Sequence, residues 1–224
     1  MNPALAISQD IQLETRVALL DAAERLFSQN GIEGTSVREI SRAAGANLGA
    51  INYHFGTKDR LALEVFARRL KPINRERINR LDALEAAAGS DKLKIEQIVE
   101  ALVRPAVESE EVAAGDCMRL ISRCFQEPNP EVKKFVEEEF AEVTRRFDSA
   151  LARTLPGLSP SDLFWRTCFL HGALHYGVQK WLLFDQIHLD FLHPDATKPD
   201  REGLIRSLSA FLTAGLSAPV STLK

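Results

Sequence analysis

Polar side chains and glycines alternate closely in one short stretch of the sequence, "AGANLGAINYHFGTKD", which covers residues 44–59. Its polar members carry amides, a phenol, an imidazole, a hydroxyl and an ammonium; they are Asn47, Asn52, Tyr53, His54, Thr57 and Lys58. Groups of these types could act in a catalytic loop, hold the phosphates of a nucleotide, or form a helix end that contacts another molecule. The spacing and the surrounding elements decide among the three.

The first two chemistries fit the stretch poorly. A phosphate-binding loop for nucleotides needs the pattern G-x-x-x-x-G-K-[ST] after a strand, and "GAINYHFGTK" has a different spacing. Catalysis by His54 would require a carboxylate or a nucleophile held beside it, and no neighbouring residue qualifies. We therefore expect a binding surface. A purely structural helical cap, with its polar residues solvated, remains the alternative.

The segments before this stretch have helical spacing. Apolar residues recur at intervals of three and four over residues 14–29, which predicts a helix that Gly31 ends. Ser36 followed by Glu39 is a capping-box pattern, and it predicts a second helix of barely two turns before Gly45. These two helices are the elements that must support the polar stretch.

The stretch itself predicts a helix-turn-helix unit. "NLGAINYHF" reads as a third short helix, with Asn47 as its N-cap and Gly56 as its end. Thr57 is predicted to cap a fourth helix from residue 58 to about residue 85, with a kink at Pro72. Two short helices around a glycine-containing turn, supported by a longer first helix, form this motif.

One side of the third helix is the predicted docking face. Burial of Ile51 and Phe55 would leave Gly49, Ala50 and Tyr53 facing outward. Glycine and alanine keep a helix thin, so its backbone can approach the floor of a DNA groove. An asparagine beside them suits a bidentate contact with adenine, while tyrosine and histidine side chains can reach phosphate oxygens.

Lys58 supplies a further argument for an anionic partner. A cation in the first turn of a helix lies at the positive end of the helix dipole, which is mildly unfavourable. A DNA phosphate held jointly by the helix amides and the ammonium would remove this conflict. Thr35 and Ser36, at the start of another helix, could hold a phosphate in the same way.

The remainder of the chain predicts longer helices and no strands, so the predicted fold class is all-α. Helices are expected at about 92–108, 116–126, 131–155, 160–185 and 200–217, with a loop at 86–91. Ser159 and Pro160 form a strong start signal for the helix at 160–185. We predict an N-terminal helix-turn-helix domain at residues 12–72 and a larger helical domain at residues 73–217.

Composition narrows the class of protein. The chain has 224 residues, is 45% hydrophobic and carries a net charge of −3, all typical of a globular protein. Residues 1–80 hold 12 Lys and Arg against 9 Asp and Glu, which permits a DNA-facing first segment. Three separated cysteines without a CxxC pair suggest reduced thiols. We expect a cytoplasmic protein with no secretory signal, membrane span, metal or cofactor.

The stretch "LLDAAERLFSQNGIEGTSVREISRAAGANLGAINYHFGTKDRLALEVF" resembles the TetR family of bacterial transcriptional regulators. The resemblance implies a third helix in the major groove of DNA. Residues implied at base edges are Leu48, Gly49, Ala50 and Asn52. Residues implied at phosphates are Thr35, Ser36, Tyr53, His54 and Lys58. Spacing alone would turn Leu48 inward, so a groove contact and a core contact both remain open for it.

"NLGAINYHFGTK", "MRLISRCF" and "LFWRTCFLHGA" further resemble the PsrA-type regulators, which respond to long-chain fatty acids or their thioesters. This implies a small apolar effector. The candidate effector-binding residues are Arg119, Arg123, Phe125, Trp165, Arg166, Phe169 and His175. His171 and His175 have the i, i+4 spacing of two metal ligands, but Gly172 stands where a metalloprotease has glutamate. Structural or pocket histidines are the better interpretation.

The segment "LFWRTCFLHGALHYGVQKWLLF" is apolar on nearly all sides, so it must be covered on all sides. A buried central helix of a monomer would satisfy this. The TetR resemblance instead implies a homodimer whose last two helices from each subunit form a four-helix bundle. The candidate dimerisation residues are Gly172, Ala173, Tyr176, Gly177, Leu208, Phe211 and Leu212.

The predicted function is a homodimeric repressor, not an enzyme, that an apolar effector releases from a palindromic operator in double-stranded DNA. One alternative keeps the DNA-binding domain and replaces the small effector by a protein partner. Another is a small all-α enzyme, although the sequence offers it no nucleophile–base pair and no metal-ligand set.

Overall fold

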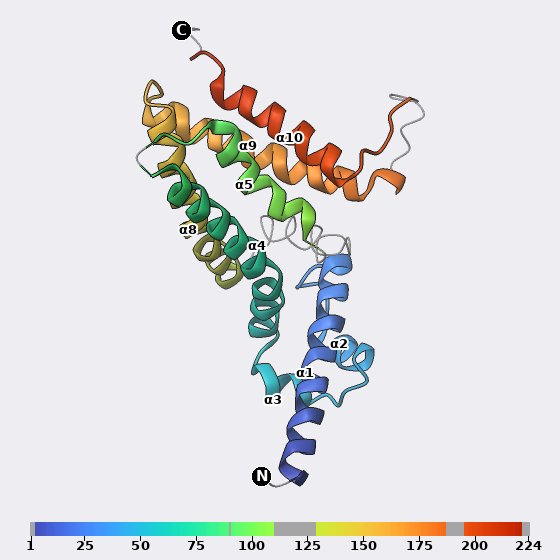
Figure 1. The fold of residues 1–224 in the computed structure, drawn as a ribbon. Coiled ribbons are helices and arrows are strands. Elements are labelled where there is room, and N and C mark those ends of the chain that lie inside the picture. Colours follow the sequence, from blue (N-terminus) through green and yellow to red (C-terminus); the bar gives the residue numbers. More distant parts are fainter. Residues whose placement is uncertain (1–2, 90, 110–128, 187–194, 221–224) are drawn as a thin grey trace. The chain divides into compact units, whose positions relative to one another are not determined.

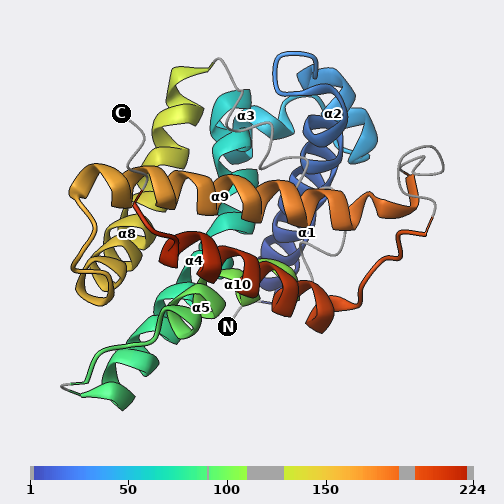
Figure 2. The same ribbon diagram turned by 90° about the horizontal axis from the view of Figure 1, so that it is seen from above.

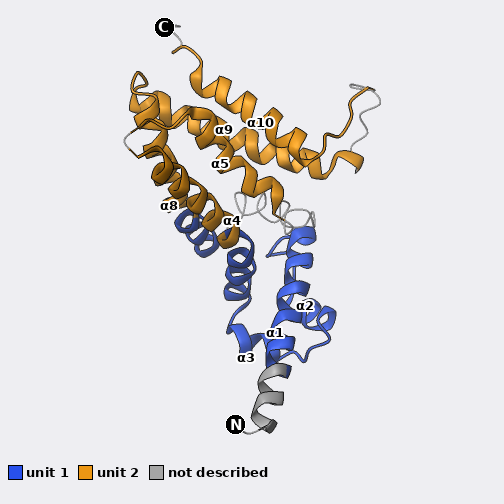
Figure 3. Cartoon of the chain, viewed as in Figure 1, with its two compact units in different colours: residues 1–70, 119–139 blue, residues 71–118, 140–224 orange. Residues whose placement is uncertain are grey.

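A computed structural model describes residues 3–89, 91–109, 129–186 and 195–220 (Figure 1). Every regular element in these ranges is helical, which confirms the predicted all-α class. The chain divides into two compact units (Figure 3): residues 1–70 with 119–139, and residues 71–118 with 140–224. The first division falls two residues before Pro72, inside one long helix. The division at 72–73 drawn from the sequence stays a prediction.

The first unit contains α1 (Pro3–Asn30), α2 (Val37–Ala43), α3 (Ala50–Phe55) and the start of α4 (Lys58–Ala88). The α1 helix begins well before the predicted residue 14. Each of these helices contributes apolar side chains to one core, which contains Leu19, Ala23, Phe27, Ile40, Ile51, Phe55, Leu61, Val65 and Phe66. The short α2 and α3 are therefore held by burial rather than by their own helix propensity.

Local capping residues set the ends of these helices. The Ser36 hydroxyl accepts from the Glu39 amide at 3.2 Å and the Glu39 carboxylate accepts from the Ser36 amide at 2.8 Å, which confirms the capping box. Thr57 caps α4 by accepting from the amide of Arg60 at 3.1 Å, as predicted. The prediction for Asn47 is wrong, because the N-cap of α3 is Gly49 and no side chain caps that helix.

Charged side chains join α1 to α4 inside the first unit. Glu24, which is buried, accepts from Arg68 at 3.0 Å and from Arg69 at 2.8 Å. Arg68 also donates to Asp21 at 2.5 Å. Both arginines therefore join α4 to α1, because α1 supplies carboxylates directly opposite them. The network fixes the base on which α2 and α3 rest.

The second unit is built from the rest of α4 with α5 (Ile95–Glu108), the later part of α8 (Pro130–Thr154), α9 (Pro160–Leu182), a 3-10 turn η1 (Phe184–Gln186) and α10 (Arg201–Ser217). Figures 1 and 2 show α9 and α10 running antiparallel beside each other, and α5 packs against α10. Its core includes Leu81, Ile98, Leu102, Phe147, Leu170, Leu174, Val178, Ile205, Leu212 and Leu216.

The helix starts of this unit follow the sequence signals. Ser159 caps α9 by accepting from the Asp162 amide at 3.1 Å, with Pro160 at the first helical position, as predicted. Asp200 caps α10 by accepting from Gly203 at 2.7 Å. The α9 helix ends at Leu182, three residues before the predicted end. The helix predicted at residues 116–126 lies outside the described residues.

Candidate nucleic-acid interface

The α3 helix has an exposed side, called the tip below, formed by Leu48, Asn52 and Tyr53, and a buried side formed by Ile51 and Phe55. Ile51 and Phe55 point into the core, as predicted. On the opposite side Asn52 is exposed, Tyr53 is 70% exposed and Leu48, just before the helix, is 50% exposed. Exposure of two large apolar side chains beside an amide is unusual for a surface that meets only water. The tip is therefore suited to contact another macromolecule.

Helical spacing suggested that Leu48 is buried and Ala50 exposed, and the structure shows the opposite for both residues. Leu48 faces outward because α3 begins only at Ala50, so helical spacing does not apply to residue 48. Ala50 is only 7% exposed, and the prediction that it lies at base edges is wrong because its methyl group joins the core with Ile51. The outward set around the tip is therefore Leu48, Gly49, Asn52 and Tyr53.

Gly49 has no conformational reason to be glycine. Its φ of −77° and ψ of −13° are allowed for any L-residue. A Cβ atom placed there would meet only the Oδ1 atom of Asn47, at an ordinary 3.5 Å. By contrast, Gly45 and Gly56 adopt φ values of +63° and +79°, where other residues are strained. The space above Gly49 is open, which fits a close approach by a partner.

Thr35 cannot serve as the predicted phosphate ligand through its side chain. The residue is 1% exposed, and its hydroxyl donates to the carbonyl oxygen of Gly31 at 2.7 Å. Ser36 is exposed, but its hydroxyl donates to the Glu39 carboxylate at 2.7 Å. This hydrogen bond is the largest cause that lowers the pKa of Glu39. A phosphate contact by Ser36 stays a prediction, and it would have to compete with the capping box.

Lys58 has partners within the fold, contrary to the expectation that it needs an anionic partner. Its ammonium donates to the carbonyl oxygens of Ile32 at 2.8 Å and of Thr35 at 3.2 Å. These carbonyls compensate the cation near the start of α4, so no phosphate is needed to explain it. Lys58 thereby ties α4 to the loop before α2, a positioning role that sequence spacing did not reveal.

His54 and Tyr53 lie together at the tip. Their ring centroids are 4.9 Å apart in an edge-to-face arrangement, which restricts the orientation of the exposed phenol. Phe55 behind them is covered by the guanidinium of Arg16, 5.1 Å from the ring centroid. Both contacts hold the polar tip in one orientation. The prediction that Tyr53 and His54 contact DNA phosphates stays a prediction.

Basic residues on α2 were missed by the sequence reasoning. Arg38 and Arg42 are exposed and one helical turn apart, on the side of α2 opposite the buried Ile40. In helix-turn-helix proteins the first helix of the motif crosses the nucleic-acid backbone, where arginines contact phosphates. The i, i+4 spacing of this pair was a signal available in the sequence. We add both arginines to the candidate interface.

These features together are those of a helix-turn-helix protein: two short helices around a tight turn, with an exposed tip on the second. Residues 19–65 match the family described as bacterial regulatory proteins, tetR family, and residues 100–215 match the tetracyclin repressor-like C-terminal domain. The second match covers just over half of the chain. The chain therefore belongs to the TetR family of bacterial regulatory proteins.

Curated relatives match over about a quarter of the chain. The transcriptional regulator AcrR of Shigella flexneri is 51% identical over 53 residues, which is 24% of this chain and 25% of that protein. The transcriptional repressor AcnR of Corynebacterium efficiens is 41% identical over 54 residues, which is 24% of this chain and 29% of that protein. The matched region thus spans between a quarter and a third of each relative.

Solved structures share the fold over nearly the whole chain. The fatty acid degradation regulator FadR from Bacillus halodurans superposes with a TM-score of 0.62 at 18% identity, over 92% of this chain and 97% of that one. FadR from Bacillus subtilis, in complex with stearoyl-CoA, gives a TM-score of 0.56 at 17% identity, over 89% and 98% of the two chains. At these identities the likeness establishes the fold alone.

The predicted effector residues do not form one site. Trp165 is 56% and Phe169 is 68% exposed, and the two rings stack on the outer face of α9, which contradicts a place in an apolar pocket. Arg166 donates to the carbonyl oxygen of Leu216 at 2.5 Å and so caps the end of α10. Of the described members of this set, Arg166 and His175 are half-buried. Arg119, Arg123 and Phe125 lie outside the described residues.

The predicted dimerisation residues separate into two groups. Gly177 and Leu212 face inward, since a Cβ atom on Gly177 would lie 2.9 Å from the Cδ2 atom of Leu208 and Leu212 is buried. These residues, with Leu208, pack α9 against α10 within one chain, and their contact with a partner stays a prediction. Gly172, Tyr176 and Phe211 face outward, and Ala173 is half-buried.

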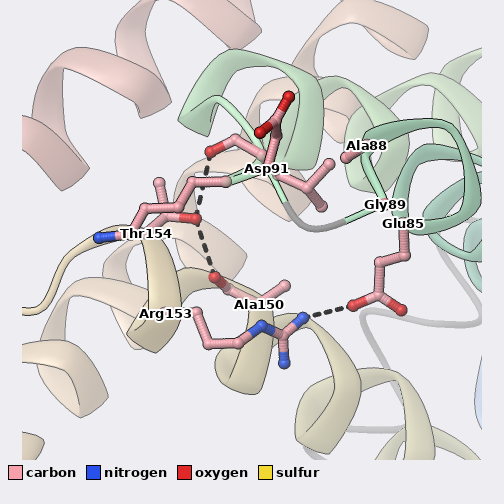
Figure 4. Close-up of a pocket in the computed structure, with 9 residues that line it drawn as sticks. Glu85, Ala88, Gly89, Asp91, Ala150, Arg153 and Thr154 are labelled. Carbon is pink, nitrogen blue, oxygen red and sulfur yellow. Dashed lines mark hydrogen bonds and ion pairs between the residues drawn. The ribbon is translucent and has the colours of Figure 1, made fainter.

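A hollow of about 470 Å³ lies between the end of α4, the loop after it and the end of α8 (Figure 4). Arg153 forms an ion pair with Glu85 across it, and the hydroxyl of Thr154 donates to Ala150 at 3.0 Å and to Leu93 at 3.3 Å. Asp91 and Lys92 also line the hollow, and this charged lining does not suit an apolar effector. None of the predicted effector residues lines it.

No helix in the described ranges is long and apolar enough to cross a membrane.

Proposed function

We propose that this TetR-family protein is a homodimeric DNA-binding repressor that a small apolar effector, a fatty acid or acyl thioester, releases from a palindromic operator. The single observation that carries the proposal is the exposed tip of α3, where Leu48, Asn52 and Tyr53 project from a buried base. AcnR of Corynebacterium efficiens, which is 41% identical over 54 residues, is described as a repressor.

DNA binding by the tip is supported by its chemistry. Asn52 can make a bidentate contact with adenine, and Leu48 can contact the methyl group of thymine. The exposed guanidinium groups of Arg38 and Arg42 on α2 are placed for phosphates on the flanking backbone. The open space above Gly49 lets the backbone of α3 approach the groove floor.

Dimerisation is supported by an exposed aromatic face in the second unit. Its members are Phe164, Trp165, Phe169 and Tyr176 on α9 and Phe211 on α10, each more than half exposed. Covering ~100 Å² of apolar surface on each ring would contribute about 2.5 kcal/mol per ring before the costs of association. A second copy of the antiparallel α9–α10 pair fits this face, since a two-fold axis places like surfaces together.

A dimer would fix the distance between its two α3 helices. Two α3 helices about 34–36 Å apart would read successive major grooves of a palindrome. An effector that binds more tightly to a conformation with another spacing would release the operator, in proportion to its differential affinity for the two states. The bound stearoyl-CoA of Bacillus subtilis FadR supports an acyl ligand for a protein of this fold.

The proposal is tested by selecting duplexes from a random DNA pool with the purified protein. We expect a palindromic consensus with half-site centres about one helical turn apart. Asn52→Ala should relax selection at one base pair of each half-site, while Asn79→Ala, an exposed amide on α4 in the second unit, should leave the consensus unchanged. A pool that shows no enrichment would refute the proposed function.

A further inference from the structure

The turn before α3 carries an exposed amide side chain, that of Asn47. The sequence predicts this residue as the N-cap of α3, but the N-cap is Gly49 and no side chain bonds to it. In the part of the chain that the structure describes, no residue forms a hydrogen bond with the Asn47 side chain. Its amide group is therefore free to bind a partner.

Asparagine is common in turns for two physical reasons, and neither applies to Asn47. It tolerates a positive φ, and its side chain can bond to the backbone nearby. Every positive φ among the described residues belongs to a glycine. The turn is held by backbone bonds instead: Ala46 donates to Ser41 at 2.9 Å, and Ala50 donates to the carbonyl oxygen of Asn47 at 3.1 Å. The turn therefore does not depend on the amide side chain.

The Asn47 side chain lies over the bare surface of Gly49. A Cβ atom placed on Gly49 would lie 3.5 Å from the Oδ1 atom of Asn47. The carbonyl oxygen of Gly49 accepts from the Tyr53 amide at 3.0 Å, so Gly49 belongs to the first turn of the helix. Residues three and four apart on a helix share a face, which places Gly49 with Asn52 and Tyr53. The amide of Asn47 is therefore on the same side of α3 as that of Asn52.

The separation of these two amides matches the spacing of stacked bases. One amide lies over Gly49 and the other belongs to Asn52, so they are about 4.5 Å apart along the helix axis. Successive bases of one DNA strand are about 3.4 Å apart along the duplex. Two side chains placed in this way would reach neighbouring base pairs. An asparagine amide can donate to N7 of adenine and accept from N6, a pattern that adenine alone presents in the major groove.

The residues around Asn47 also favour A·T pairs over G·C pairs. Leu48, the next residue, is 50% exposed. An A·T pair presents adenine to an amide and the thymine methyl group to an apolar side chain. Guanine is read mainly by arginine or lysine, and α3 contains neither. The exposed arginines Arg38 and Arg42 lie on α2 instead, where they suit phosphates.

We propose that Asn47 is a second specificity-determining residue, which reads an adenine next to the adenine read by Asn52. Each half-site of the operator then contains two neighbouring A·T pairs. This inference rests on the proposed function, since it concerns the DNA that the tip of α3 would contact. A phosphate contact by the same amide would instead weaken binding to all sequences alike.

The test uses the full-length protein and its selected duplex, with each adenine replaced in turn by 7-deaza-2′-deoxyadenosine, which lacks the N7 acceptor. We expect two neighbouring adenines in each half-site whose replacement weakens binding about two- to tenfold in an anisotropy titration. In Asn47→Ala one of these two positions should become insensitive to the replacement while the other stays sensitive. A wild type with no second sensitive adenine would overturn the proposal, and so would an Asn47→Ala variant that keeps both sensitivities.

Asn47→Ala should also weaken specific binding about five- to 150-fold and relax selection at one base pair of each half-site. Equal weakening of operator and unrelated duplexes would show a phosphate contact and overturn the base contact. Asn79→Ala, the exposed amide on α4 in the second unit, is the matched control and should bind as the wild type does.

Asn47→Asp separates recognition from any role in folding. Aspartate serves as well as asparagine at helix caps and in turns, but its carboxylate has no N–H donor for N7 of adenine. We expect an unchanged thermal midpoint and the same loss of specific binding as in Asn47→Ala. Wild-type operator affinity in Asn47→Asp, or a lowered midpoint in Asn47→Ala, would contradict the proposal.

Failure of this inference and failure of the proposed function give different results. A protein that enriches no duplex from a random pool refutes the proposed function. A protein that enriches a palindrome whose consensus is the same for the wild type and Asn47→Ala keeps the proposed function and refutes only the role of Asn47.

Discussion

Acidification should destabilise the folded, ligand-free protein through His175. Burial, the charge of Arg77 and the neighbouring His171 lower the pKa of this imidazole to about 4, from an ordinary value of 6.5. Between these two values the unfolded chain binds a proton that the folded chain does not. The free energy of unfolding therefore falls as the pH decreases from about 6.5 to about 4, and the contribution is fully present only above 6.5.

The magnitude follows from the two pKa values. One pKa unit corresponds to about 1.4 kcal/mol, so the complete effect is about 3 kcal/mol. At pH 5 the imidazole is almost fully protonated in the unfolded chain and almost fully neutral in the folded one, and the loss is about 2 kcal/mol. His171, whose pKa is lowered for the same first cause, adds in the same direction. A loss of this size is a substantial part of the stability of an ordinary domain.

The assay is urea unfolding followed by circular dichroism from pH 7.5 to pH 5, at one fixed subunit concentration. Other groups also titrate over this range, so the informative quantity is the difference between the wild type and His175→Gln. The wild type should lose about 2 kcal/mol more than the variant on going to pH 5. Identical pH dependence in the two proteins, or an NMR titration of His175 at 6.5 or above, would refute the reasoning.

Four further predictions concern the surfaces. Gly49→Val should lower operator affinity at least tenfold in an anisotropy titration, because the added side chain would meet the groove floor in the complex. Its thermal midpoint in a melting curve should be unchanged, because the side chain meets open space in the free protein. Asn52→Ala should cost about 1–3 kcal/mol of specific binding in the same titration. Arg42→Ala should weaken binding to all sequences alike and reduce the salt dependence by about one phosphate contact. Phe169→Glu should produce monomers in sedimentation velocity, whereas Ala152→Glu on the exposed side of α8 should not.

Much of the fold could be predicted from the sequence because its signals are local. Ser36, Thr57 and Ser159 each accept from an amide three residues ahead, so the residues that make the cap are neighbours in the chain. The signals of the helix-turn-helix motif are also close together in the sequence, so the motif could be predicted. The N-cap prediction for Asn47 failed because the turn extends to Gly49. Asparagine is common both in turns and at helix N-caps, so its presence does not distinguish the two.

The candidate site was less predictable because its polar partners are distant in sequence. Lys58 bonds to carbonyls more than twenty residues earlier, and Arg166 bonds to the end of a helix fifty residues later. Arg77 stands among other charged residues in the sequence, and only the fold shows that it is buried and bonded to Leu102 on α5. Periodicity likewise could not separate the inward face of α9 from its outward face, since both carry large apolar side chains.

In the proposed complex two copies of α3, held by one dimer, read adjacent turns of duplex DNA. Sedimentation equilibrium of the protein with its selected duplex measures whether such a complex forms. We expect a stable dimer without DNA and a complex of two subunits per palindromic duplex that weakens steeply with added salt. A monomer at all concentrations that binds no duplex at any ionic strength would contradict the account.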